Sequence, residues 1–289
     1  MEFTECVPQT RKALTLPWQE TLVMPVGDVQ LGAQGVATER LQRHIQWGLE
    51  QGAYFLGMGD YVDVMSPSNR AAWRSVKRYD SVTNAMTEKA EEHLAEFLRL
   101  VDGSAGRWLG LLEGHHYFDF EDGTTSDTRI CQALGAPFLG TCAAVILRFH
   151  REHSNSSLRC IIWAHHGVGS SKRQAGPLNK LEDVMGWFEA DVYLMGHMTK
   201  KPAAPKPRLY VSATPPYHLV AKKKYIAGTG GFYEGYLAGS LDPTHKRPQG
   251  GYVEQKLLDP VAMGGIVVKI RPVHSSGADG DRLDLNVEI

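Results

Sequence analysis

Five short apolar segments of the chain each end on a residue that can bind a metal ion. The clearest is 54–58, which is followed by Gly59-Asp60. An apolar run of this length is typical of a strand that is buried on both faces of a parallel sheet. The residue after such a strand lies at the carboxyl edge of the sheet, where open α/β folds bind their ligands. The other four runs end at Asp28, at His115-His116, at His165-His166 and at His197.

Each of these ends has an ordinary explanation when it is taken alone, because Gly-Asp pairs are also common in turns. Their repetition at five successive strand ends favours a single site. Glycine next to the polar residue allows a sharp turn and a close approach of the backbone to a bound group. Carboxylate and imidazole ligands together suit manganese, zinc or iron, and no cysteine stands at any of these ends. The pattern therefore predicts a metal site.

Length and composition are those of an ordinary globular protein. The chain has 289 residues, of which 43% are hydrophobic and 22% are charged. A formal net charge of -1 argues against a protein that coats nucleic acid, although a nuclease with a local basic patch remains compatible with it. We predict one domain over 1–289, with a leader at 1–20, a metal-site core at 21–199 and a strand-rich part at 200–289. The last part contains a glycine-rich loop at 228–251.

The cysteines and the N-terminal residues indicate a cytoplasmic protein. The four cysteines, at positions 6, 131, 142 and 160, show no paired spacing and are expected to be reduced. The N-terminal segment lacks the basic start and apolar middle of a signal peptide. No apolar run approaches the length needed to span a membrane.

Hydrophobic periodicity predicts alternating strands and helices as far as His197, and mainly strands after it. Helices are expected at 38–51, within 66–103, at 128–134 and at 178–189. Strands outside the five runs are expected at 145–149, 208–212, 217–226 and 265–270. The loop at 228–251 is too rich in glycine for regular packing and is a candidate lid over the site.

The order of these motifs resembles the calcineurin-like metallophosphoesterase family, whose pattern is D-x-H, G-D-x-x-D, G-N-H, H and G-H-x-H. Residues 59–63, Gly-Asp-Tyr-Val-Asp, match the second motif fully, and Gly196-His197 matches the first half of the last. The resemblance covers 28–199. It implies an α/β fold, a four-layer α/β/β/α sandwich of two mixed sheets with the site at the strand ends.

The resemblance also implies a ligand set. Asp60 would be shared between two divalent metal ions, Asp28 would bind the first, and His115, His165 and His197 would bind the second. The choice between His165 and His166 stays open, with His165 favoured as the first residue past the strand.

Three positions depart from the family pattern. Gln30 stands at the histidine of D-x-H, His115 at the asparagine of G-N-H, and Thr199 at the last histidine of G-H-x-H. Imidazole at 115 is a competent ligand. An amide and a hydroxyl bind borderline cations weakly, so Gln30 and Thr199 would leave the first metal weak or absent. Manganese is the favoured metal, with zinc, iron or magnesium as alternatives.

By the same resemblance the chain is a metal-dependent phosphoesterase that hydrolyses a phosphodiester, in a nucleotide or a nucleic acid, by attack of a metal-bound hydroxide. His116 would act as the acid beside the leaving group, and Asp63 would orient the site by hydrogen bonding. Lys200 and Arg70 are candidate contacts to the substrate phosphate. The alternative is a degenerate relative with one metal that serves as a binding or scaffold protein.

Overall fold

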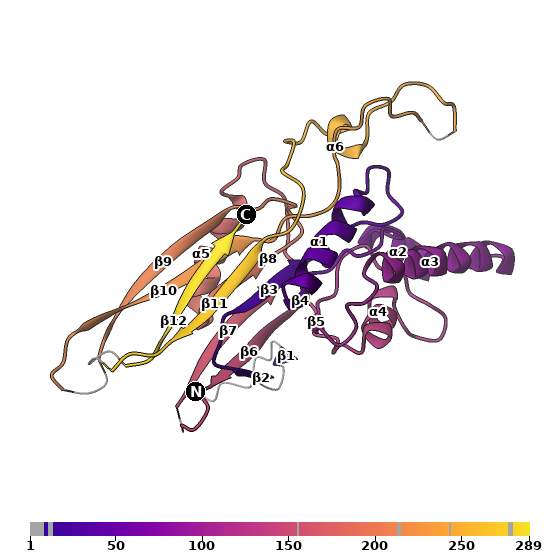
Figure 1. The fold of residues 1–289 in the computed structure, drawn as a ribbon. Coiled ribbons are helices and arrows are strands. Elements are labelled where there is room, and N and C mark those ends of the chain that lie inside the picture. Colours follow the sequence, from indigo (N-terminus) through magenta and orange to yellow (C-terminus); the bar gives the residue numbers. More distant parts are fainter. Residues whose placement is uncertain (1–8, 11–13, 155, 213–214, 243, 277–279) are drawn as a thin grey trace, which may run out of the picture.

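The computed structural model describes residues 9–10, 14–154, 156–212, 215–242, 244–276 and 280–289. Within these residues the chain forms two β-sheets with helices on their outer sides (Figure 1). Most of the predicted leader and Cys6 lie outside the described residues. Trp18, at the end of that leader, is half-buried against the core between the sheets.

Sheet I has seven strands. Their order is β1 (Gln9–Thr10), β6 (Cys142–His150), β7 (Ser157–His165), β8 (Val192–Met195), β10 (Leu219–Gly228) and β9 (Ala203–Val211), and β2 (Leu14–Pro17) also pairs with β6. Strands β7, β8 and β10 run parallel, whereas β6 and β9 run antiparallel to their neighbours β7 and β10. Sheet I is therefore mixed, and the parallel strands occupy its middle.

Sheet II has five strands. Their order is β12 (Arg282–Glu288), β11 (Val267–Val273), β3 (Thr21–Val26), β4 (Tyr54–Gly57) and β5 (Trp108–Leu111). Strands β3, β4 and β5 are parallel, and β11 is antiparallel to both β3 and β12. The three parallel strands are the ones that lead to Asp28, Asp60 and His115.

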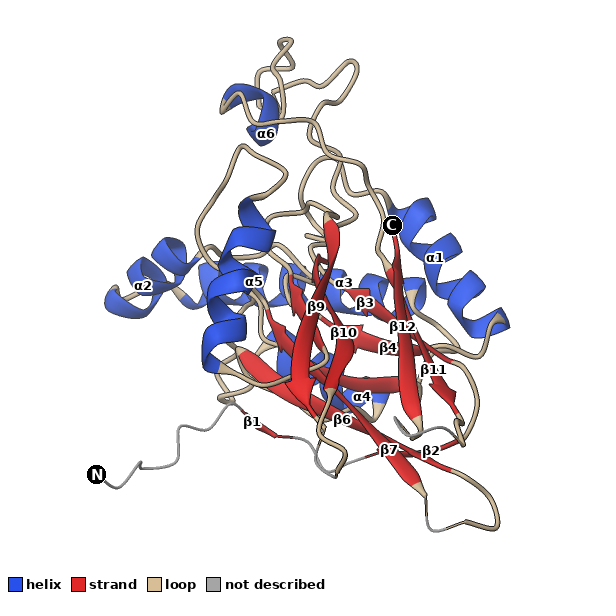
Figure 2. Ribbon diagram, turned by 90° about the vertical axis from the view of Figure 1, so that its left-hand side faces the viewer, coloured by secondary structure: helices blue, strands red, loops and turns tan. Residues whose placement is uncertain are grey.

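The apolar core has three layers of contact, which define a four-layer α/β/β/α sandwich. Between the sheets, Ile162 of sheet I packs in the same cluster as Leu56 and Val268 of sheet II. On the outer face of sheet II pack α1 (Thr38–Glu50), α3 (Asp80–Leu100) and α4 (Ser126–Leu134). On the outer face of sheet I packs α5 (Gly176–Trp187). The two views show the helices on opposite sides of the sheets (Figures 1 and 2). The predicted fold class is confirmed.

Local sequence signals explain where several helices begin and end. Helix α2 (Pro67–Ser75) begins with proline at its first position. The preceding Ser66 is its N-cap, and the Ser66 side chain accepts a hydrogen bond from the Asn69 N–H. Gly52 after α1 and Gly135 after α4 both have φ near +60°, the left-handed conformation that glycine adopts without strain. The short α6 (Tyr252–Gln255) was not predicted.

Several strands differ from the sequence expectation: β1 and β2 lie in the predicted leader, β6 is longer than the predicted 145–149, and β9 and β12 differ more. Strand β9 begins at Ala203, whereas the prediction placed its start at 208. The prediction missed the first half because Pro205 and Pro207 are unusual in a strand. Proline cannot donate to a ladder, but β9 is an edge strand and has a neighbour on one side only. Strand β12 was missed, although Leu283, Leu285 and Val287 alternate with polar residues as in a half-buried strand.

The packing between the sheets yields a test of the fold. We expect Ile162→Ala, which removes a fully buried side chain between the sheets, to lower the free energy of unfolding by about 2–5 kcal/mol. Urea unfolding followed by circular dichroism measures this change. The control is Leu257→Ala, at a side chain 74% exposed, which should change stability by less than about 0.5 kcal/mol. An equal effect of the two substitutions would contradict the layer assignment.

Candidate metal centre

Residues from five strand ends lie together where the ends of the two sheets meet. Sheet II contributes Asp28 after β3, Asp60 after β4 and His115 after β5. Sheet I contributes His166 after β7 and His197 after β8. Ligand atoms of His115, His166 and His197 lie within 4.8 Å of one another, and so do those of Asp28, Asp60 and His197. His197 belongs to both groups.

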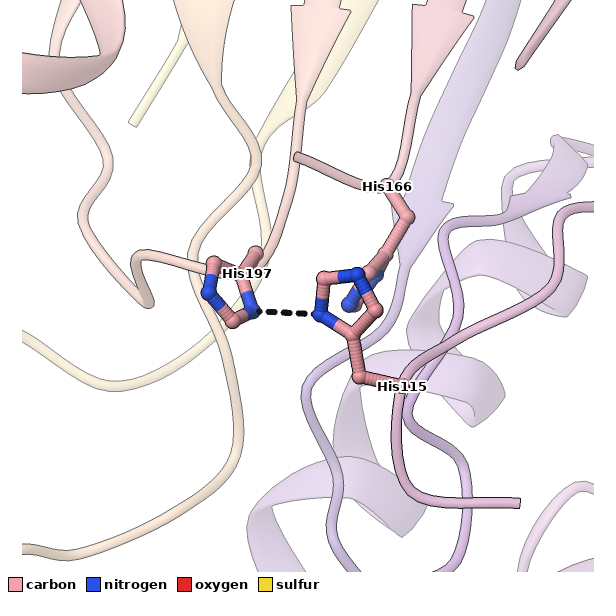
Figure 3. Close-up of side chains that lie close together, drawn as sticks. All are labelled: His115, His166 and His197. Carbon is pink, nitrogen blue, oxygen red and sulfur yellow. Dashed lines mark hydrogen bonds between the residues drawn. The ribbon is translucent and has the colours of Figure 1, made fainter. Parts of the chain in front are cut away.

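The three histidine rings face one another from three different loops (Figure 3). His115 Nδ1 and His197 Nδ1 are 3.2 Å apart. The ring of His166 lies edge-on to that of His115, with centroids 4.5 Å apart. Its Nε2 is 3.4 Å from Asp60 Oδ2. Three imidazoles and a carboxylate oxygen form a ligand set that suits zinc, manganese or iron.

Both carboxylates are buried and are fixed by backbone donors from the histidine loops. Asp60 Oδ1 accepts hydrogen bonds from the N–H groups of His115 and His116, the latter at 3.1 Å. Asp28 Oδ2 accepts one from the His197 N–H at 2.8 Å. Each carboxylate thus uses one oxygen to order a loop that carries a histidine.

The remaining polar atoms of the cluster fit a cation. Among the described residues, the buried Asp28 Oδ1 has no hydrogen-bond partner, and the buried Asp60 Oδ2 and His166 Nε2 have only the long 3.4 Å contact with each other. A buried carboxylate oxygen without a partner is costly, and in native proteins such atoms call for an explanation, such as a bound ion. The chemistry of the donors and the lack of partners agree, so the residues present fit a divalent metal ion.

The pKa values of these groups follow from burial and from their mutual charges. Burial raises the pKa of Asp28 to about 7. Burial also acts to raise the pKa of Asp60, but hydrogen bonding and charge from His166 outweigh it and hold that pKa below its ordinary value. Burial lowers the pKa of His197 to about 4, with the charge of His166 as a further cause. His197 is thus a neutral imidazole near pH 7, the form that binds metals.

The backbone at the site is held in an uncommon conformation. Asp28, Gln30, Asp60, His197 and Thr199 all have positive φ, between 48° and 66°. Such residues cost of order 1–3 kcal/mol each and persist only where surrounding contacts impose them. Here the N–H groups of Val29 and Gln30 both donate to the Asp60 carbonyl at 2.9 Å, which ties the first metal loop to the second. The strain is concentrated where the ligands are presented.

Two glycines allow the loops to approach one another. A Cβ atom on Gly114 would lie 2.0 Å from the Asp60 nitrogen, and one on Gly59 would lie 2.7 Å from the Gly114 Cα. No side chain fits at either position. This contact brings the N–H groups of His115 and His116 to the Asp60 carboxylate.

The structure places His166 in the cluster, and not His165, which the sequence favoured. His165 is the last residue of β7 and lies on the outer face of sheet I, where its ring stacks on Trp163 with centroids 5.7 Å apart. Its Nδ1 accepts a hydrogen bond from the Gly167 N–H at 2.7 Å. Alternation along the strand puts Ile162, Ala164 and then His166 on the inner face. Continuing that alternation past the strand end would have identified His166 from the sequence.

His166 has the hydrogen bonding of a metal ligand. Its Nδ1 is 2.6 Å from the Met58 carbonyl oxygen, so Nδ1 carries the proton and Nε2 is left for a cation. Burial acts to lower the pKa of His166, but Asp60 and then Asp28 raise it to about 9. Without a cation, a proton on Nε2 is therefore stabilised by the same carboxylates.

Gln30 and Thr199, predicted at the first metal, lie at the cluster as neutral groups. Gln30 lines the cavity beside it. The Thr199 hydroxyl donates to the Met198 carbonyl at 2.8 Å. Asp28 and Asp60 are thus accompanied by one imidazole, that of His197, whereas the second group has three. The two groups therefore differ in their number of imidazoles, and the prediction of a weak or absent first metal stays a prediction.

His116, predicted as the acid, forms a pair with Asp63. His116 Nδ1 is 2.7 Å from Asp63 Oδ1, and both side chains line the cavity. The hydrogen bond to Asp63 raises the pKa of His116 against the opposing effect of burial. A histidine with a raised pKa and a carboxylate partner is suited to donate a proton.

One positioning residue was not found from the sequence. Asp127 is fully buried in the first turn of α4 and accepts a hydrogen bond from the Gly114 N–H at 2.9 Å. Burial raises the pKa of its carboxyl group to about 7. An aspartate in a first helical turn is unremarkable in a sequence, and only its contact with Gly114 connects it to the histidine loop.

The two predicted phosphate contacts have different outcomes. The Arg70 guanidinium is buried and donates to the carbonyl oxygens of Met65, His115 and Tyr117 at 2.6–3.1 Å. It therefore supports the histidine loop and does not line the cavity, so the prediction that Arg70 contacts the substrate phosphate is wrong. Lys200 does line the cavity, but its Nζ is 3.3 Å from Asp259 Oδ2.

A cavity of about 590 Å³ opens beside the cluster. His116, Asp63 and His197 lie on one side of it, and residues from the loop at 228–251 and from α6 lie on the other. Residues of the loop predicted as a lid thus line this cavity, and its role as a lid stays a prediction. The volume is within the range of about 300–1,000 Å³ that holds small-molecule ligands.

Comparisons with known proteins give limited information. No protein-family model matches the chain, and no curated protein matches it. Among solved structures it is similar to Vps29 complexed with zinc from Entamoeba histolytica, with 11% identity, 92% of this chain and 99% of that chain covered, and a TM-score of 0.37. A predicted phosphoesterase from Streptococcus pneumoniae shows 11% identity, coverage of 92% and 98%, and a TM-score of 0.31. Vps29 from Chaetomium thermophilum shows 10% identity, coverage of 92% and 95%, and a TM-score of 0.33.

At these identities and TM-scores the likenesses assign neither a family nor an activity to the chain. Among the described residues, no helix is both long enough and apolar enough to cross a membrane.

The placement of the two adjacent histidines predicts different effects on metal binding. We expect His166→Ala to lose the tightly bound metal, because His166 is one of three clustered imidazoles. His165→Ala should retain it, since His165 faces the opposite side of the sheet. Metal content after gel filtration, by mass spectrometry, measures both. Retention of metal by His166→Ala together with its loss from His165→Ala would reverse the assignment.

The unequal groups predict one firmly bound metal ion per chain. The Asp28 group should fill only when metal is in excess, because Gln30 and Thr199 are weak ligands. The double substitution Gln30→His with Thr199→His should raise the retained metal from one equivalent toward two. Two equivalents retained by the unaltered protein would show that the amide and the hydroxyl are adequate ligands.

Proposed function

We propose that the protein is a metal-dependent phosphoesterase of the calcineurin-like type that acts on phosphodiesters. The observation that carries the proposal is the placement of the His116–Asp63 pair on the wall of a cavity, next to the imidazole and carboxylate cluster. The match of residues 59–63 to the G-D-x-x-D motif supports it, since Asp60 lies in the cluster and Asp63 pairs with His116.

The cluster residues are assigned to metal binding. His115, His166, His197 and Asp60 would hold the tighter cation, and Asp28 and Asp60 the weaker one. A divalent cation bound there supplies a Lewis acid that polarises a phosphoryl oxygen and lowers the pKa of bound water. The chain itself fixes the ligands through the backbone donors and the packed glycines described above.

His116 is assigned to proton donation. Its Nδ1–H is held by Asp63, so a second proton resides on Nε2 when the ring is charged. The raised pKa keeps a larger fraction of the ring charged near neutral pH. Transfer of the Nε2 proton to a leaving alkoxide or phenolate oxygen would avoid release of a strongly basic anion.

The charge of the cavity favours diesters over monoesters. Its lysines, among the described residues, are Lys172 and Lys200, and Lys200 already pairs with Asp259. A monoester dianion needs more compensating charge than a diester monoanion. A binding or scaffold role is the second candidate, and the observation in its favour is the loss of two imidazoles to Gln30 and Thr199.

The assignment of His116 predicts a specific loss of activity. With added manganese, the protein should hydrolyse bis-p-nitrophenyl phosphate with a higher kcat/KM than p-nitrophenyl phosphate. His116→Ala should lower the rate by about 10²–10⁴-fold, the usual contribution of a positioned acid. Its metal content should stay unchanged, because His116 is outside the clustered ligands.

Turnover by the unaltered protein no higher than that of His116→Ala would favour the scaffold role. A preference for the monoester would leave the phosphoesterase in place and refute the diester assignment.

The His116–Asp63 pair predicts a shift in the pH profile. Asp63 raises the pKa of His116, and activity that needs charged His116 is present below this pKa and lost as pH rises through it. Asp63→Asn removes the charge but keeps an oxygen that can accept the Nδ1–H. The basic limb of the kcat/KM profile should therefore move to lower pH. Asp122→Asn, at the exposed loop before α4, is the control and should leave the limb in place; an unmoved limb in Asp63→Asn would contradict the role of the pair.

A further inference from the structure

An arm, defined as residues 232–263 apart from 243, projects from the sandwich (Figures 1 and 2) and lines the cavity beside the cluster. It leaves and rejoins the sandwich at one point, because Gly231 and Gly264 form a β-bridge between β10 and β11. The Phe232 N–H donates to the Asp28 carbonyl at 3.0 Å. A Cβ on Gly231 would lie 2.9 Å from the Asp28 Cβ. The root of the arm is thus packed directly on the metal-site loop.

Further contacts fix the arm over the site. Lys200, 5% exposed and three residues after His197, pairs with Asp259 of the arm at 3.3 Å. Lys201 Nζ donates to the Met263 carbonyl at 3.3 Å. Within the arm the Tyr236 hydroxyl donates to the Leu258 carbonyl at 2.8 Å. These bonds hold the described part of the arm as a wall.

The wall that the arm gives to the cavity is mainly apolar. Its apolar lining side chains there are Tyr233, Leu241, Val253, Leu258 and Val261, beside the polar Gln249, Gln255 and Asp259. The opposite side carries His116 and His197. A molecule in this cavity would therefore meet the cluster at one end and aliphatic side chains at the other.

We propose that this cavity selects small phosphodiesters with one apolar ester group of about the size of a phenyl ring, which Val253, Leu258 and Val261 contact. The inference rests on the proposed phosphoesterase function and narrows its substrate. A phosphate held at the cluster places its non-leaving ester group across the cavity, toward the arm. Burying apolar atoms against these three side chains is favourable, whereas a charged or strongly hydrated group placed against them would lose water that they cannot replace.

The same features disfavour a nucleic acid strand. Binding of a phosphate backbone relies on several free lysine or arginine side chains. Lys200 is neutralised by Asp259, and the other lysine that lines the cavity is Lys172. The arm also limits the cavity to a small-molecule volume of about 590 Å³.

Two diesters with one leaving group and different remaining groups test the inference. We expect kcat/KM for p-nitrophenyl phenyl phosphate to exceed that for p-nitrophenyl methyl phosphate by about 10-fold or more. Leu258→Asp should reduce this ratio to near one. Leu257→Asp is the matched control, because Leu257 is the preceding leucine, is 74% exposed and does not line the cavity. It should keep the ratio.

A binding measurement separates this inference from the proposed activity. By calorimetry, diphenyl phosphate should bind the manganese-loaded protein about 10-fold or more tighter than dimethyl phosphate, and Leu258→Asp should remove the difference. Selective binding of diphenyl phosphate without hydrolysis of either ester would refute the phosphoesterase and keep the inference. Hydrolysis of the two p-nitrophenyl diesters with equal kcat/KM, together with equal affinity for diphenyl and dimethyl phosphate, would keep the phosphoesterase and refute the inference. A higher kcat/KM for thymidine 5′-p-nitrophenyl phosphate than for the phenyl ester would also overturn the inference, in favour of a nucleotide.

Discussion

The site depends on the burial of two carboxylates, Asp28 and Asp60, between the ends of the sheets. A buried carboxylate must be compensated, and here each is compensated by the backbone of a loop from a later strand. Asp60 orders the loop of His115 and His116, and Asp28 orders the loop of His197. Satisfying the carboxylates therefore also aims the histidines.

The glycines and the left-handed residues follow from the same requirement. The loops can meet the carboxylates only if their backbones approach more closely than side chains allow, which explains Gly59 and Gly114. Asp28 and Asp60 have positive φ at the points where their carboxylates accept hydrogen bonds from the neighbouring loops. Arg70 and Asp127 complete the arrangement, since they bond the carbonyl and N–H groups of the same histidine loop.

Much of this was predictable because it is encoded locally. Apolar runs that end in Gly-Asp or in histidine indicated the strand ends and a single site, and the sandwich was implied by the resemblance of their order to a known family. What the sequence left open depends on contacts between distant segments. The role of Arg70 is decided by carbonyls about 45 residues away, and that of Asp127 by its contact with Gly114. The choice of His166 over His165 was a different failure, since strand alternation on the inner face encodes it. The prolines in β9 argued against a strand, and they are tolerated because β9 lies at the edge of its sheet.

The cluster draws its ligands from the strand ends of both sheets, so a bound cation would affect the stability of the whole sandwich. Asp28, Asp60 and His115 belong to sheet II, while His166 and His197 belong to sheet I. A cation held by both sets acts as a cross-link between segments far apart in the chain, as a disulfide does in other proteins. Binding that occurs only in the folded state adds to stability by mass action, by about 2.7 kcal/mol at a hundredfold excess over Kd. A cation bound at the cluster would therefore also stabilise the contact between the two sheets at this end of the sandwich.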